Sequence, residues 1–144
     1  MPEGPRLTPA PRAETIGFTH MPSRDVVVVE DDSGLRTALE KVLSAGGYRP
    51  AVFESAELLL ASDAAGEAGC LVLDVRLPGM SGLELYRRLD SRGPAPPPAI
   101  FMTAYDDPDV RAEAERLGQY LVKPFRGREL LEAVAEALGV NATS

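Results

Sequence analysis

Residues 70–79 read CLVLDVRLPG, an apolar run that stops on the carboxylate of Asp74 and then breaks into a Pro-Gly turn. Short apolar runs bounded by turn residues are typical of strands buried on both faces. Such strands occur mainly in parallel sheets covered by helices, where ligands gather at the carboxyl ends of the strands. The stretch therefore predicts a buried strand over 70–73, with Asp74 at the functional edge of a parallel sheet.

Runs of the same kind recur on both sides of this stretch and alternate with amphipathic segments. Four valines at 26–29 are typical of a strand buried on both faces, whereas Pro50 marks the run at 48–53 as an edge strand. The pattern predicts strands at 26–29, 48–53, 70–73, 99–102 and 120–122, and helices at 33–45, 56–61, 81–89, 108–117 and 128–138. Five successive strand–helix units with right-handed crossovers form a parallel sheet with helices on both faces.

Length and composition favour one folded domain. The 144 residues are 44% hydrophobic and 26% charged, as in globular proteins. Prolines and turn formers fill residues 1–24, so we expect a disordered tail there, a folded domain over 25–138 and a short tail over 139–144. Met21 is an alternative start. No apolar run approaches the about 18 residues of a membrane span and the N-terminus lacks an apolar signal core, so we expect a cytoplasmic protein without a membrane partner.

Net charge and cysteine content exclude several kinds of site. The formal net charge of −7 argues against nucleic acid as a direct partner, because a phosphate-binding face needs a basic excess. The single Cys70 excludes an intramolecular disulfide and a multi-cysteine metal site, and its apolar neighbours predict a core position.

Polar residues follow four of the five expected strands. These strands end on Glu-Asp-Asp at 30–32, on Asp74, on Thr103 and on Lys123, and in a parallel sheet such ends share one edge. Neighbouring carboxylates repel one another and require a divalent cation, and oxygen ligands favour Mg²⁺. A hydroxyl and an ammonium beside them suit a phosphoryl group. Taken singly, each feature has an ordinary explanation: a helix-capping acidic turn, a strand-end hydroxyl and a surface lysine.

Four motifs together resemble the receiver domains of two-component response regulators. They are the acidic run at 30–32, LDVRLPGMSG at 73–82, Met-Thr-Ala at 102–104 and Lys-Pro-Phe at 123–125. The second motif is most similar to the nitrogen-fixation and LuxR-type branch, and the resemblance covers residues 25–138. It implies a CheY-like, flavodoxin-like (βα)5 fold, an α/β protein with a doubly wound, five-stranded parallel sheet in the order 2-1-3-4-5.

The resemblance also implies roles for residues at the strand ends. Asp74 corresponds to the phosphoacceptor, which takes a phosphoryl group from the phosphohistidine of a sensor histidine kinase. Glu30 and Asp31, together with Asp74 and the backbone carbonyl of Arg76, correspond to the ligands of Mg²⁺. Asp32 is then left to cap the following helix.

Further residues correspond to the switch of the family. Thr103 matches the hydroxyl that turns inward onto the acyl phosphate, and Tyr120 matches the aromatic residue that moves with it. Lys123 pairs with the phosphoryl oxygens, and the family pattern implies a cis bond to Pro124. Gly79 is expected in a turn beside the site.

Two features of this chain bear on lifetime and output. Arg76 and Tyr105, which lie two residues past Asp74 and Thr103, are bulky, and we expect them to hinder the hydrolytic water and slow self-dephosphorylation. The segment between residues 118 and 123 is roughly two residues shorter than the family pattern. We therefore expect the helix at 108–117 to be short or partly unwound.

The sequence thus predicts a receiver, stand-alone or excised, that switches protein–protein contacts. It is not expected to be an enzyme beyond its own phosphotransfer and self-dephosphorylation. Expected partners are a sensor histidine kinase or phosphotransfer protein and a downstream protein target, with a phosphorylation-dependent homodimer left open. A phosphatase of the haloacid-dehalogenase type would need an acid where Arg76 stands, and a phosphorylation-independent pseudo-receiver would lack Asp74, Thr103 or Lys123. A dinucleotide-binding fold would need a glycine-rich loop after the first strand.

Overall fold

A computed structural model describes residues 23–139 of the protein. Of the tails expected at 1–24 and 139–144, only residues 23, 24 and 139 lie within this range, and Met21 lies outside it.

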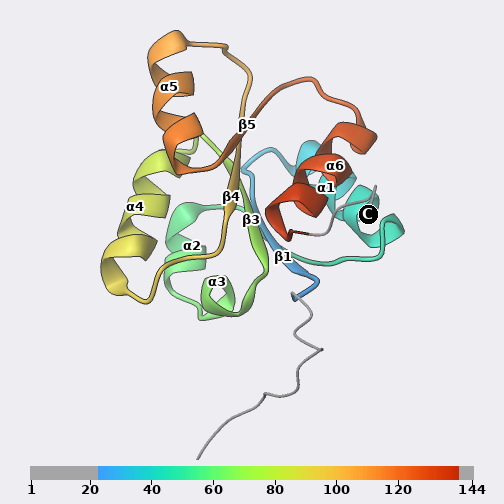
Figure 1. Ribbon diagram of the computed structural model, residues 1–144, viewed down its shortest axis with the longest axis horizontal. Coiled ribbons are helices and arrows are strands. Elements are labelled where there is room, and N and C mark those ends of the chain that lie inside the picture. The colour runs from blue at the N-terminus through green and yellow to red at the C-terminus, as the bar shows by residue number, and fades with distance from the viewer. Residues whose placement is uncertain (1–22, 140–144) are drawn as a thin grey trace, which may run out of the picture.

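The sheet has five parallel strands in the order β2-β1-β3-β4-β5 (Figure 1). They are β1 (Asp25–Val29), β2 (Arg49–Phe53), β3 (Cys70–Asp74), β4 (Ala99–Thr103) and β5 (Gln119–Val122). This order confirms the predicted doubly wound, flavodoxin-like fold, with the proline-containing β2 at an edge. Asp74 pairs with Met102 and Thr103 pairs with Val122, so the carboxyl ends of these strands are level. The residues that follow β1, β3, β4 and β5 therefore emerge at one edge of the sheet.

Helices cover both faces of the sheet (Figure 1). One face carries α1 (Ser33–Ala45) and α6 (Gly127–Ala137), and the other carries α2 (Ala56–Leu60), α3 (Ala64–Glu67), α4 (Gly82–Arg92) and α5 (Pro108–Leu117). The sequence did not predict α3, a single turn that buries only Ala65, because a run of alanines and glycines has no apolar periodicity.

The helix α5 is regular throughout its expected bounds, so the expectation that it would be short or partly unwound is wrong. Asp107 caps it by accepting hydrogen bonds from the amides of Asp109 and Val110. Gly118 then joins α5 directly to β5, and a Cβ at this position would lie 2.2 Å from the main-chain oxygen of Ala99. The short connection is thus accommodated by close contact with β4 rather than by loss of helix.

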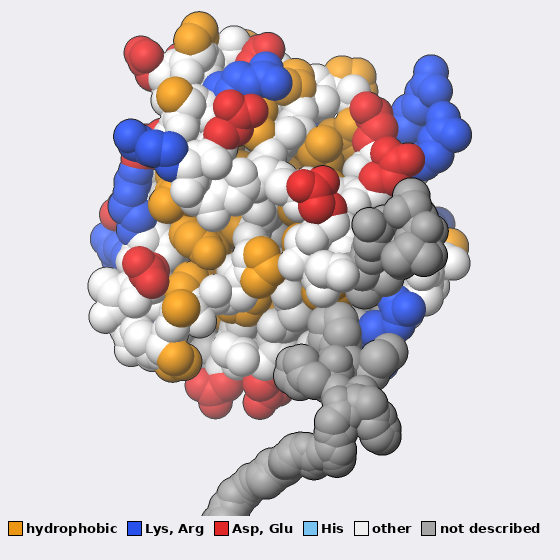
Figure 2. All heavy atoms as spheres, in the orientation of Figure 1, with side chains coloured by type: hydrophobic (Ala, Val, Ile, Leu, Met, Phe, Trp, Pro, Cys, Tyr) orange, Lys and Arg blue, Asp and Glu red, His pale blue; other side chains and the backbone are white. Residues whose placement is uncertain are grey.

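The surface mixes charges of both signs. On the face seen in Figure 2, basic side chains lie among acidic ones and do not form one continuous basic patch. Within residues 23–139, no helix combines the length and the apolar character that a membrane crossing needs.

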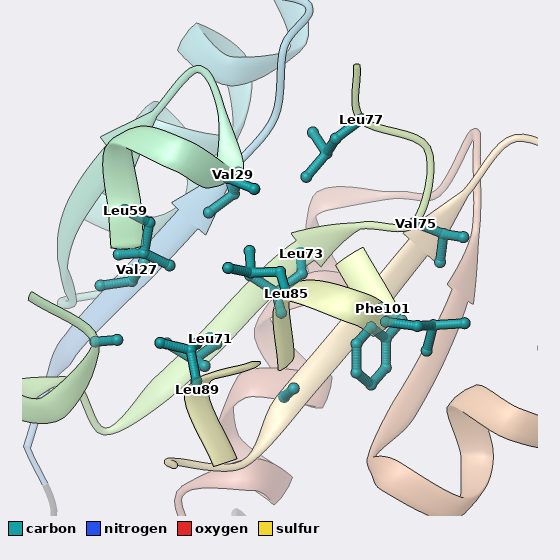
Figure 3. Close-up of a cluster of buried hydrophobic side chains, with 14 of the residues drawn as sticks. Val27, Val29, Leu59, Leu71, Leu73, Val75, Leu77, Leu85, Leu89 and Phe101 are labelled. Atoms are coloured by element: carbon teal, nitrogen blue, oxygen red, sulfur yellow. The ribbon is translucent and has the colours of Figure 1, made fainter. Parts of the chain in front are cut away.

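The core is divided by the sheet into two clusters. Alternate strand residues face opposite ways, so that Val27, Leu71 and Phe101 pack against α2, α4 and α5, while their neighbours pack against α1 and α6. Figure 3 shows the first cluster, where Leu85 lies against the central strands. Cys70 is fully buried in the second cluster, as predicted. β3 is paired with β1 and β4 and is buried throughout, and its last residue is Asp74.

Candidate functional site: an acidic cluster bridged by a lysine

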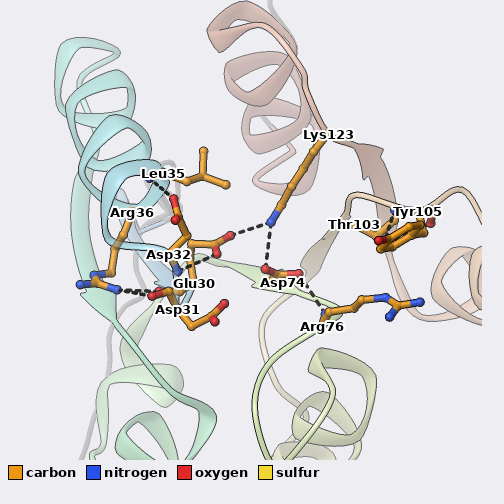
Figure 4. A network of polar contacts seen from close by, with 10 residues as sticks. All are labelled: Glu30, Asp31, Asp32, Leu35, Arg36, Asp74, Arg76, Thr103, Tyr105 and Lys123. Atoms are coloured by element: carbon orange, nitrogen blue, oxygen red, sulfur yellow. Dashed lines mark hydrogen bonds and ion pairs between the residues drawn. The ribbon is translucent and has the colours of Figure 1, made fainter.

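The expected site residues meet at the carboxyl edge of the sheet (Figure 4). Glu30 follows β1, Asp74 ends β3 and Lys123 follows β5. The Lys123 Nζ donates to Glu30 Oε1 and to Asp74 Oδ2, at 2.9 Å in each case. These three residues lie far apart in the sequence. They meet because the carboxyl ends of the parallel strands β1, β3 and β5 lie at one edge of the sheet.

The two carboxylates are buried while the lysine reaches partly to solvent. The side chains of Glu30, Asp74 and Lys123 are 1%, 5% and 19% exposed. Burial raises the pKa of Glu30, although the hydrogen bond from Lys123 opposes this. Burial alone would lower the pKa of Lys123, but its hydrogen bonds and charge interactions with the two carboxylates outweigh that effect and raise it. Lys123 is therefore held in its charged form beside both acids.

Backbone amides fix the remaining carboxylate oxygens. Glu30 Oε2 accepts a hydrogen bond of 3.0 Å from the amide of Asp32, and Asp74 Oδ1 accepts one of 2.9 Å from the amide of Arg76. Each buried carboxylate thus accepts one hydrogen bond from the shared Lys123 ammonium and one from a backbone amide, and these two bonds fix its orientation.

The acidic residues fit a hard divalent cation. Glu30, Asp31 and Asp74 each place a carboxylate oxygen within 4.8 Å of the others, and Asp31 is exposed. An all-oxygen set with a solvent-facing member is the chemistry that Mg²⁺ prefers, since this ion keeps several waters. Asp32 does not join them, because its Oδ2 accepts from the Leu35 amide at 2.8 Å and caps α1 as the sequence predicts.

The two expected switch residues meet at the backbone of Tyr105 rather than at Asp74. The buried Thr103 hydroxyl donates to the Tyr105 carbonyl and accepts from the Tyr105 amide, both at 3.2 Å. The Tyr120 hydroxyl donates to the same carbonyl at 3.3 Å. A rotation of the Thr103 side chain toward Asp74 would therefore break its hydrogen bond to the Tyr105 carbonyl, which also accepts a hydrogen bond from Tyr120.

Arg76 and Tyr105 form a stacked pair beside Asp74 (Figure 4). The guanidinium carbon of Arg76 lies 4.4 Å from the centre of the Tyr105 ring, and Tyr105 is 61% exposed. This geometry is that of a cation–π contact. The sequence singled out both residues for their bulk, but it gave no sign that they stack on each other.

The remaining expected features lie near the site. The Lys123–Pro124 bond is cis, and Gly79 has a φ of 82°, as its predicted turn requires. The structure places the Arg76 amide against Asp74, and the Arg76 carbonyl as a metal ligand stays a prediction.

Comparison with known proteins gives the family. The sequence profile of the response regulator receiver domain matches residues 26–135. The chain belongs to the response regulator receiver family. The receiver is 40% identical over 118 residues to the transcriptional regulatory protein TdiR of Thauera aromatica and 38% identical over 122 residues to FixJ of Azorhizobium caulinodans. The match covers 81% and 83% of this chain but 52% and 57% of these relatives, so the chain spans about half their length. FixJ confirms the predicted branch.

Solved structures agree with this assignment. The BeF3-activated DrrB receiver domain matches with a TM-score of 0.70 and 28% identity, covering 83% of this chain and 99% of that one. TrrA of Thermotoga maritima, in complex with Mg²⁺-BeF, matches with a TM-score of 0.69 and 30% identity, covering 79% and 98%. The fold and the family are thus shown independently.

One residue of the receiver's site was missed in the sequence. The Arg36 Nη1 donates to the carbonyls of Glu30 and Asp31, at 2.9 and 3.3 Å. An arginine one turn into the helix that follows the acidic run was the available signal, because such a side chain can reach back over the loop.

Proposed function

We propose that this receiver accepts a phosphoryl group on Asp74, with Mg²⁺, from a sensor histidine kinase or a phosphotransfer protein, and that the modification switches its contacts with a downstream protein. The observation that carries the proposal is the buried Asp74 carboxylate. It is hydrogen-bonded to Lys123, and its oxygen lies within 4.8 Å of carboxylate oxygens of Glu30 and Asp31, close enough for one metal ion to bind all three. A strand-end carboxylate so arranged is oriented for attack and surrounded by groups that stabilise anionic oxygens.

The proposed chemistry is an in-line transfer. An Asp74 carboxylate oxygen forms a bond to phosphorus while the P–N bond to the donor histidine breaks. The electron pair of that bond returns to the imidazole, which leaves neutral when its other nitrogen carries a proton. Glu30, Asp31 and Asp74 would hold Mg²⁺, together with the Arg76 carbonyl, and the bound ion would offset charge on the phosphoryl oxygens. The Lys123 ammonium would pair with a phosphoryl oxygen in place of Asp74.

The switch follows from the contacts of Thr103. Its hydroxyl is bonded to the backbone of Tyr105, and we expect it to leave this partner for the acyl phosphate. Tyr120 donates to the same Tyr105 carbonyl, and we expect its ring to move inward when the Tyr105 backbone shifts with Thr103. A differential interaction of a few kcal/mol is enough to shift the population of two such states decisively.

We expect the acyl phosphate to be long-lived. The stacked Arg76 and Tyr105 lie beside Asp74 and would limit the approach of water to the phosphorus. In this proposal the only reactions of the receiver are its own phosphotransfer and self-dephosphorylation, so it is not an enzyme acting on a separate substrate.

The output is proposed to act through protein contacts in the cytoplasm. TdiR and FixJ are transcriptional regulatory proteins, and the receiver matches about half of each. The chain's net charge of −7 does not favour contact with DNA by the receiver itself. A protein target or a second phosphorylated copy is the proposed recipient of the signal.

Intact mass after incubation with acetyl phosphate and Mg²⁺ tests the proposal. We expect one phosphoryl adduct on the wild-type protein and none on the Asp74→Asn variant or without Mg²⁺. Asp32→Asn is the matched control, because it also removes one carboxylate near the site but retains a capping side chain, and its adduct should persist. A folded wild-type protein that gains no adduct would point to a phosphorylation-independent binding module instead.

A further inference from the structure

Arg36 offers no ligand to the acidic cluster but is hydrogen-bonded to the backbone that carries it. Its Nη1 donates to the carbonyl of Glu30 at 2.9 Å and to the carbonyl of Asp31 at 3.3 Å. We propose that Arg36 is a positioning residue for the cation, which holds the Glu30–Asp31 backbone so that both carboxylates face the site. The inference rests on the proposed Mg²⁺ site and names a residue that tunes it.

The loop between β1 and α1, which accepts the hydrogen bonds of Arg36, is short and is attached to α1 by several hydrogen bonds. Three residues join β1 to α1, and the Asp32 carboxylate caps the helix at the amide of Leu35. The Arg36 amide donates to the Asp32 carbonyl at 2.8 Å, which is the first hydrogen bond of the helix. The guanidinium extends this attachment back to Glu30 and Asp31, so three consecutive carbonyls are bonded to one residue.

The guanidinium and the carboxylates lie on different sides of the loop. Figure 4 shows the Arg36 head group on the side away from Asp74, while the carboxylates of Glu30 and Asp31 point toward it. Arg36 therefore bonds to main-chain oxygens and leaves the carboxylate oxygens for a cation. Lys123 differs in this respect, because it bonds to a Glu30 carboxylate oxygen directly.

Such a restraint matters because the carboxylates repel one another. Glu30, Asp31 and Asp74 each place a carboxylate oxygen within 4.8 Å of the others, a separation at which like charges repel. Without a cation, this repulsion favours movement of the exposed Asp31 away from the cluster. Hydrogen bonds from Arg36 to the backbone of the loop keep the carboxylates near their binding positions, so the loop loses less conformational entropy when the cation binds.

The expected effect is on the affinity for Mg²⁺. Loss of a group that orients metal ligands typically weakens metal binding by about 10–100-fold. Because the contact to the Asp31 carbonyl is long and exposed, we expect the lower end, about tenfold, for Arg36→Gln. Arg36→Lys should weaken binding less, because an ammonium still donates to the loop but lacks the planar, pre-organised guanidinium.

Titration calorimetry of the full chain with MgCl₂ tests the inference. The matched control is Arg49→Gln, which removes the same charge from an arginine that pairs with Asp25 at the opposite end of β1. We expect the control to bind Mg²⁺ like wild type. In the acetyl phosphate reaction, Arg36→Gln should need about tenfold more Mg²⁺ for half-maximal rate and reach the wild-type rate at saturation.

The outcomes separate this inference from the function on which it rests. Wild type that binds no Mg²⁺ refutes the proposed function and the inference together. Wild type that binds Mg²⁺, with Arg36→Gln unchanged or with Arg49→Gln weakened equally, overturns only the role of Arg36. Circular dichroism in EDTA reports whether each variant is folded. If Arg36→Gln is not, Arg36→Lys decides the matter, and an unchanged affinity in that variant refutes the inference.

Discussion

Replacing Lys123 by Met should destabilise the protein through its two buried carboxylates. Met keeps an unbranched apolar stem but removes the ammonium that donates to Glu30 and Asp74 at 2.9 Å. Breaking a buried ion pair by removing one partner costs about 3–5 kcal/mol, because a buried charge is left uncompensated. Lys123 is 19% exposed and Glu30 is able to take up a proton, so we expect about 2–3 kcal/mol at pH 8 without Mg²⁺.

The destabilisation should shrink as the pH falls. The pKa of Glu30 is raised in the folded protein, so protonation of Glu30 favours folding, and the contribution is full below its ordinary pKa of 4.5. That contribution is lost as the pH rises through the raised value. Without the Lys123 ammonium the pKa rises further, and the variant binds this proton over a wider range. The difference in unfolding free energy between the two proteins should therefore be smaller at pH 5 than at pH 8.

Urea unfolding followed by far-ultraviolet circular dichroism measures the effect. Lys41→Met is the matched control, since Lys41 is the only other lysine of the chain and lies exposed on α1. Its unfolding free energy should stay within about 0.5 kcal/mol of wild type. Saturating Mg²⁺ should raise the unfolding free energy of Lys123→Met above its value without Mg²⁺, because the cation binds the folded state and offsets the charge of the carboxylates that have lost Lys123. A Lys123→Met variant as stable as wild type at pH 8, or a pH-independent difference, would refute this account.

Three further predictions concern the helix cap, a close backbone contact and the stacked pair. Asp32→Ala should lose about 1 kcal/mol of unfolding free energy in urea with little change in Mg²⁺ affinity by calorimetry, since its carboxylate caps α1. Gly82→Ala should cost about 1–3 kcal/mol in the same assay, because its Cβ would lie 2.3 Å from the main-chain oxygen of the last β3 residue, whereas Gly66→Ala, with nothing within 4 Å, should be tolerated. Joint replacement of Arg76 and Tyr105 by Ala should speed loss of the phosphoryl adduct in a mass time course, and an unchanged rate would exclude a shielding role for the pair.

The sheet was predictable because its strands carry their own signal. Runs such as the valines at 26–29 are buried on both faces, and a parallel sheet is the arrangement that accommodates them. The site followed from the same logic, because strand ends share an edge whatever the details of packing. Asp32 was separated from its acidic neighbours by the resemblance to the family, and its place directly before the first helical residue agrees with the capping role.

Contacts that cross between elements were not predictable in this way. The stacking of Arg76 on Tyr105 depends on how the loops after β3 and β4 approach each other, which no local pattern encodes. The regularity of α5 depends on the close passage of Gly118 past β4, and the sequence shows only that the segment is short. The hydrogen bond from Arg36 to the Glu30 carbonyl depends on a side chain that extends back toward the N-terminus of its own helix.

The charge of the cluster would allow one site to bind a cation and also to act as the proposed switch. Lys123 pairs with Glu30 and Asp74, and the exposed Asp31 lies beside them, so three carboxylates and one ammonium give the cluster a formal charge of −2. A divalent cation neutralises this charge, and this match favours Mg²⁺ over a monovalent ion. An acyl phosphate on Asp74 would carry about two negative charges in place of one and add oxygen acceptors. The added charge would draw Lys123 and the Thr103 hydroxyl toward the phosphoryl group, so that Lys123 would leave the Asp74 carboxylate oxygen and Thr103 would leave the Tyr105 carbonyl. The contacts of the unmodified site would therefore hold while Asp74 carries a single charge, and this dependence on charge would couple the proposed phosphorylation to the backbone of Tyr105.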